Sequence, residues 1–184
     1  MRTVCTLFLV SLLSACMSTR PKNDLGFSEV KKISNLDGCY LNLAETGKNV
    51  GKKYLSSIVF PNSKLVHDTV EAIDVKSAGR SFIVKAIAQE KVIHQGEFLE
   101  GRDFIFSNGT LTITKAFGSG LSEPGSVFLG VGMQSTTLGV DASGDGRVVE
   151  DLKIAGTAFL IIPVAASGTD VVRYVKAPNR CGLS

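Results

Sequence analysis

Cysteine and histidine are the residues of this 184-residue sequence with the widest range of possible chemistry, and it has four cysteines and two histidines. The histidines, His67 and His94, stand apart from each other and from any G-x-S-x-G or H-E-x-x-H run. Such runs place a nucleophile or a metal beside its catalytic partner. Without one, the sequence predicts a protein that is not an enzyme.

One acidic segment has the composition of a cation site. Residues 141–146 read Asp-Ala-Ser-Gly-Asp-Gly, which places oxygen ligands and a glycine as at the start of an EF-hand loop. The twelfth position of that loop should be a bidentate glutamate, but it is Leu152. We therefore interpret the segment as a hairpin turn, with calcium binding as the alternative, and expect no metal and no cofactor.

The N-terminus has the layout of a targeting signal. Arg2 precedes the largely apolar residues 4–13, and Leu13-Ser14-Ala15-Cys16 follows. The apolar run is too short to cross a bilayer as a helix, which needs about 20 residues. An ordinary secretory signal and a buried first helix are the alternatives to the interpretation that follows.

Residues 13–16 resemble the lipobox of bacterial lipoproteins. The resemblance implies that residues 1–15 are a signal peptide that is removed, and that Cys16 becomes the lipid-modified N-terminus. Met17 stands where an aspartate would favour retention in the inner membrane. The resemblance therefore implies an outer-membrane protein, held by membrane lipid through Cys16 and facing the periplasm or the cell surface.

Removal of Cys5 and acylation of Cys16 leave Cys39 and Cys181. An even pair of cysteines in an oxidising compartment favours a disulfide. Metal binding is the rival interpretation, but it needs more ligands, and no histidine is near either cysteine in the sequence. We predict that Cys39 and Cys181 are bonded to each other.

Composition restricts the fold and the partners. The formal net charge of +3 is too small for an electrostatic nucleic-acid binder. A hydrophobic fraction of 44%, 19 glycines and no tryptophan favour a packed protein of strands and turns. We expect residues 16–36 to be a lipidated tether and residues 37–184 to be a single domain.

Short alternating segments separated by turns predict an all-β fold. We expect an antiparallel meander that closes into a small β-barrel of roughly 8–10 strands, because closure removes the sheet edges; a β-sandwich is the alternative. Asn108-Gly109 is the clearest hairpin turn. We expect residues 50–60 to include a helical turn, and the later strands to cover residues 126–134, 136–141, 147–155, 157–164 and 170–176.

Residues 37–40, Asp-Gly-Cys-Tyr, resemble the opening of lipocalin-type barrels, with Tyr40 in place of the family's usual tryptophan. The resemblance implies a lipocalin-like barrel. Small barrels either fill their interior with side chains or hold one apolar ligand.

We expect the barrel to bind an apolar or amphipathic small molecule. The predicted lining combines large apolar side chains with two glycines that leave room for a ligand. These residues are Phe82, Val84, Leu111, Ile113, Val127, Leu129, Gly130 and Gly132. The alternative is a structural or assembly lipoprotein that binds an envelope protein through residues 156–166. This run is apolar at both odd and even positions, so both faces of its strand would avoid water.

Overall fold

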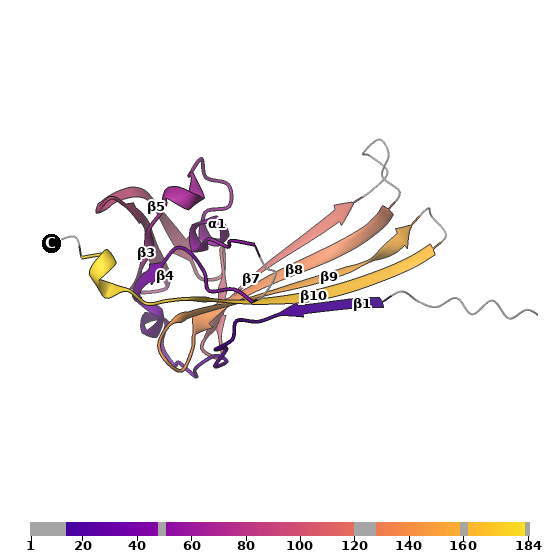
Figure 1. The fold of residues 1–184 in the computed structure, drawn as a ribbon, viewed down its shortest axis with the longest axis horizontal. Coiled ribbons are helices and arrows are strands. Elements are labelled where there is room, and N and C mark those ends of the chain that lie inside the picture. Colours follow the sequence, from indigo (N-terminus) through magenta and orange to yellow (C-terminus); the bar gives the residue numbers. More distant parts are fainter. Residues whose placement is uncertain (1–13, 48–50, 120–127, 159–161, 183–184) are drawn as a thin grey trace, which may run out of the picture.

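The computed structural model describes residues 14–47, 51–119, 128–158 and 162–182. These residues form two β-sheets with one short α-helix and three 3-10 helices (Figure 1). The predicted all-β class is therefore confirmed.

The larger sheet has six strands in the order β1-β10-β9-β8-β7-β6. β1 is parallel to β10, and the other neighbours are antiparallel. β8, β9 and β10 have 13 residues each, which corresponds to roughly 44 Å of strand. The strand bounds are Ser14–Thr19 for β1, Ile105–Ser107 for β6, Thr110–Ser119 for β7, Phe128–Val140 for β8, Gly146–Ala158 for β9 and Ile162–Tyr174 for β10.

The smaller sheet covers only one half of the larger one. Its strands are β2 (Gly38–Leu41), β3 (Ala72–Ala78), β4 (Ser81–Ala88) and β5 (Lys91–Leu99), in that order. Together the two sheets form a body, from which β7–β10 project (Figure 1). We call the projecting part the sheet extension and define it as residues 116–119, 128–133, 154–158 and 162–167.

The hydrophobic core lies in the body, between the facing sides of the two sheets. Helix α1 (Leu55–Val59) packs its Leu55 into this core and ends at Phe60, which is also buried. This agrees with the helical turn predicted within residues 50–60, of which residue 50 lies outside the described residues. The core side chains from the sheets include Tyr40, Ile73, Phe82, Val84, Ala86, Val140, Val148, Val172 and Tyr174.

The prediction that the meander closes into a barrel is not met, and the alternative of two packed sheets fits better. β2 to β10 follow one another in sequence order around the body, as in an up-and-down barrel. The regular ladder is interrupted at two places, where isolated bridges join the two sheets. Glu100↔Phe104 is at one of them, and Tyr40↔Lys176 and Glu45↔Arg173 are at the other. β2 and β6 have four and three residues, too few to continue the ladder.

The hairpin at Asn108-Gly109 forms as predicted. Both residues have positive φ, 51° and 79°, and Ser107 pairs with Thr110, so two residues connect β6 and β7. Strands were predicted over 126–134 and 136–141, but residues 128–140 form the single strand β8, and 126 and 127 lie outside the described residues. Residues 157–164, predicted as one strand, include the end of β9 and the start of β10, with 159–161 outside the described residues.

The segment expected to be a free tether lies on the larger sheet. The guanidinium of Arg147 donates to the Asp24 carboxylate at 2.6 and 3.0 Å and lies 4.3 Å from the centre of the Phe27 ring. Ser28 donates its backbone N–H to Val140 O at 2.8 Å. Residues 20–30 therefore cover the face of the sheet that points away from the core.

Cys39 and Cys181 lie at disulfide-bonding distance, with their Cα atoms 5.8 Å apart. Cys39 is in β2, and Cys181 directly follows the 3-10 helix η3 (Pro178–Arg180). The pairing that the cysteine count predicts thus connects the first strand of the body to the end of the chain.

Candidate functional site

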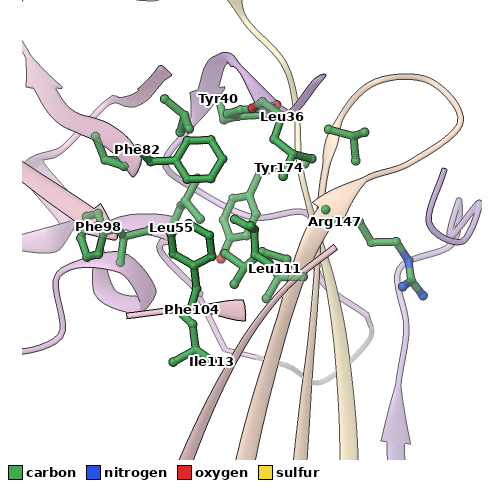
Figure 2. A pocket seen from close by; sticks show the side chains of 18 of the residues that line it. Leu36, Tyr40, Leu55, Phe82, Phe98, Phe104, Leu111, Ile113, Arg147 and Tyr174 are labelled. Carbon is green, nitrogen blue, oxygen red and sulfur yellow. Dashed lines mark hydrogen bonds between the residues drawn. The ribbon is translucent and has the colours of Figure 1, made fainter. Parts of the chain in front are cut away.

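Four of the predicted ligand-binding residues meet in the interior of the body. Phe82 and Val84 of β4 and Leu111 and Ile113 of β7 line an apolar cavity of about 110 Å³ (Figure 2). Pockets for drug-sized ligands have roughly 300–1,000 Å³. The cavity is therefore too small for a fatty acid and does not support a lipid carrier.

The other predicted ligand-binding residues lie away from this cavity. Gly130 and Gly132 belong to the sheet extension, and Leu129, also there, is 42% exposed. Val127 lies outside the described residues. β8 lines the cavity only with its body half, through Leu138 and Val140, because the strand continues past the end of the core.

Two tyrosines are among the residues that line the cavity. Tyr40 Oη donates to Leu36 O at 2.9 Å, and burial, followed by the charges of Asp37 and Asp145, raises the pKa of Tyr40 to about 12. Tyr174 is fully buried, its hydroxyl has no hydrogen-bond partner among the described residues, and burial raises its pKa still further. Both phenols are neutral at physiological pH, so neither acts as a base.

The sheet extension exposes apolar side chains of the kind that the body buries. Leu129, Val131 and Met133 are 42%, 69% and 52% exposed. They alternate along β8, so they share one face of the sheet. A shallow hollow on the extension is lined by Ala116, residues 131–133 and residues 153–155. Contiguous exposed apolar surface of this kind marks a site of contact with a partner or a membrane.

Charged residues end at one level of the larger sheet. The strand register places Cys16, Ser167, Lys153, Met133 and Ala116 in one row across the five strands. On the described strands beyond this row, residues 117–119, 128–132, 154–158 and 162–166 are all uncharged. The row therefore separates a charged body from an uncharged extension, and it contains the predicted lipidation residue.

Two exposed lysines mark this boundary on both faces of the sheet. Lys153 is in the row itself, and Lys115 directly precedes Ala116 on β7. Lys115 pairs with Gln134 while Lys153 pairs with Met133. Because neighbouring residues of a strand point to opposite faces, the two ammonium groups lie on opposite faces at nearly the same height.

The acidic segment 141–146 is the turn between β8 and β9, as predicted. The Asp141 carboxylate accepts hydrogen bonds from Ser143 N (2.8 Å), Asp145 N (3.1 Å) and Arg173 Nε (3.0 Å). Arg173 also binds the carboxylates of Asp145 and Glu45. The guanidinium supplies the positive charge that this cluster of carboxylates requires.

This network makes the stability of the body sensitive to acid. Burial raises the pKa of Asp141, but hydrogen bonds from Ser143, Asp145 and Arg173 outweigh it and hold the pKa below its ordinary value. A lowered folded-state pKa gives stability above the unfolded pKa of about 4 that is lost as the pH falls through the folded value. We expect the melting temperature to fall as the pH is lowered below about 5. We expect Asp141→Asn to lower the melting temperature at pH 7 and to make it depend less on acid.

Thermal unfolding followed by circular dichroism at a series of pH values measures both effects. The control is Asp68→Asn, which changes an exposed aspartate of the 3-10 helix η2 (His67–Thr69) and should leave the profile unchanged. Equal acid dependence in Asp141→Asn and the unmodified protein would contradict the assignment.

Ser56 and His67 form a pair that the sequence did not indicate. His67 Nδ1 lies 3.0 Å from Ser56 Oγ, a separation typical of a nucleophile and its base. Ser56 is fully buried, and Asn42 ties the same segment to the body by accepting from Ser56 N and donating to His67 O. The pair and the two hydrogen bonds of Asn42 connect α1 to η2.

Sequence reasoning also missed the exposure of β8 and the role of Arg173. The sequence analysis assigns Val127 and Leu129 to a barrel interior, although the absence of charged residues from 124 to 140 is a visible sign of a different environment. Arg173 is 28 and 32 residues from Asp145 and Asp141, so no local pattern indicates the cluster.

Comparison with protein-family models, curated proteins and solved structures found no match to this chain. Within the described residues, no helix is long and apolar enough to span a membrane. The same residues contain no group of three or more histidine, cysteine, aspartate or glutamate side chains placed to hold a metal ion. The functional assignment therefore depends on the geometry of the sheet extension and of the row that contains Cys16.

Proposed function

We propose that this chain is a lipid-anchored, non-catalytic protein of the bacterial outer membrane whose sheet extension enters the lipid beside acylated Cys16. The observation that carries the proposal is the row in which Cys16 and Lys153 lie. The acyl chains would start at the level where charged side chains end. Both features support a membrane surface at this level of the sheet.

The depth of the extension supports insertion into one leaflet. Residues 154–158 of β9 lie beyond the row and rise by roughly 17 Å. The hydrocarbon core of a bilayer is about 30 Å thick, and one leaflet is about half of it. The described extension therefore reaches about as deep as the leaflet that holds the acyl chains of Cys16.

The polar groups around the row fit this placement. Lys115 and Lys153 have stems long enough to hold their ammonium groups among lipid phosphates on either side of the sheet. Glu150, Asp151 and Asp170 lie on the body side of the row, where they remain in water. Lys53 binds Glu150 and Asp170, which gives these carboxylates a cation within the body.

A labelled cysteine at Val131 tests insertion directly. Val131 is 69% exposed on the extension, and Val66, on the body, is 62% exposed, so Val131→Cys and Val66→Cys form a matched pair. In the mature lipoprotein, with Cys16 acylated and Cys39 bonded to Cys181, the new cysteine is the one free thiol. We expect an environment-sensitive fluorophore at position 131 to emit at shorter wavelength in vesicles and to be quenched by lipids that carry nitroxides in their acyl chains.

The vesicles contain phosphatidylethanolamine and phosphatidylglycerol, and the protein carries its native acyl chains. The fluorophore at position 66 should keep its aqueous emission and escape quenching. Equal quenching at the two positions, or quenching at neither, would reject insertion of the extension.

A further inference from the structure

We infer that copies of this chain join edge to edge in the membrane, with β7 of one copy hydrogen-bonded to β10 of the next. The inference rests on the proposed function, because the lipid environment is what makes open sheet edges unfavourable. The partner it names is a second copy of the same chain.

Both outer edges of the extension lack a strand neighbour in the part of the chain that the structure describes. β6 pairs only with Thr110–Thr112 of β7, so residues 113–119 have no strand on that side. On the opposite edge, β1 pairs with residues 165–170 of β10, and residues 162–164 extend past it. Backbone N–H and C=O groups on both edges therefore face outward.

Lipidation would lengthen the open part of β10. In a chain that starts at Cys16, Ser14 and Ala15 no longer pair with Ala165 and Ala166. β1 then ends at the row where charged residues end, and residues 162–166 form an open edge on the lipid side of it. On the lipid side of the row, β1 therefore no longer pairs with the backbone of β10.

Open edges are not tolerated in hydrocarbon. Each backbone polar group there needs an internal partner, because no water is available to bind it. The described extension supplies partners for its inner strands only. A second copy that presents a matching edge would satisfy the remaining groups.

Strand direction determines which edges can match. β7 runs from the body toward the end of the extension, and β10 runs back toward the body. Pairing of β7 with β10 of the next copy is antiparallel, repeats the pattern within one copy and keeps both extensions in the same leaflet. An antiparallel β7–β7 pair would point the two extensions in opposite directions.

A contact between two different edges leaves one edge free at each end of the assembly. Further copies can therefore add at either end. The assembly stops growing when the rotation from one copy to the next brings the two free edges together in a ring. The expected products are dimers, trimers and larger species that share one type of contact. A two-fold symmetric dimer would be a different arrangement.

Cysteine cross-linking distinguishes these arrangements. Ala116 on β7 and Ala165 on β10 are exposed residues at the two edges of the sheet, on the same face. We expect the double variant Ala116→Cys/Ala165→Cys, lipidated and in vesicles, to give a ladder of cross-linked species with a short flexible bismaleimide. Each single variant should give no cross-linked species, because the introduced cysteines of neighbouring copies are then separated by the width of a whole sheet.

The matched control is Ala116→Cys/Val66→Cys, which moves the second thiol to the body and should give no ladder. Dimers from Ala116→Cys alone would show a β7–β7 contact and overturn the inference. Absence of a ladder from the double variant, with position 131 still quenched by nitroxide lipids, would also overturn it and leave the proposed function intact. If the fluorophore at position 131 is not quenched in the protein that carries Val131→Cys alone, the proposed function itself is rejected.

Discussion

Replacing Cys16 with alanine is expected to remove the protein from the outer-membrane fraction. In the proposed function the acyl chains on Cys16 would supply the anchor, since each buried methylene contributes about 0.8 kcal/mol. Without the thiol there is no site for acylation, and the cleavage that depends on acylation does not occur. The effect should be close to complete because the uncleaved and unacylated chain would lack the lipid-modified N-terminus that the proposed anchor requires.

Intact-mass analysis of the unmodified protein extracted from membranes measures the modification. It should show residues 16–184 with added acyl mass. The matched control is Cys5→Ala, which changes the other cysteine of the N-terminal segment and should leave mass and location unchanged. Soluble, unacylated protein cleaved at another position would reject the assignment of Cys16.

Breaking the link between Cys39 and Cys181 is expected to have the largest effect on stability. The two residues are 142 positions apart, and closing a loop of this length stabilises the folded state by about 5 kcal/mol in the chain-entropy model. For a protein of this size the melting temperature should fall by roughly 10–20 °C. Strain in the folded state would reduce the figure.

Thermal unfolding with and without a reductant gives the measurement. The double variant Cys39→Ala/Cys181→Ala should melt at the temperature of the reduced protein and should not respond to the reductant. Peptide mapping without reduction should recover one linked pair. Two freely alkylatable thiols in protein taken from the periplasm would contradict the pairing.

Features set by neighbouring residues were predictable from the sequence. Asn108-Gly109 forms its turn because both residues tolerate positive φ, and α1 lies inside the predicted segment 50–60. The pairing of Cys39 with Cys181 required only a count of the cysteines that remain after processing. None of these depends on knowing the register of distant strands.

The length of β8 and the extent of the core were not predictable in the same way. A strand is bounded in sequence by turn residues, and Gln134 and Ser135 separated two apolar patterns that the structure joins in one strand. The change in pattern at this point marks the end of the core and not a turn. Alternation shows which residues share a face, but the partner on that face is a non-local property.

In the proposed membrane-anchored protein, the docked N-terminal segment would determine the distance between the body and the membrane. If residues 16–36 were a flexible chain, the distance between the body and its anchor would vary by roughly 25 Å. Arg147 holds both Asp24 and Phe27 against the sheet, so residues 24–27 are not a flexible chain. Every copy would then hold the smaller sheet at one fixed height above the membrane and at one fixed angle to it. The protein would then be a rigid spacer of fixed length, and a molecule that binds the smaller sheet would have to approach the membrane surface.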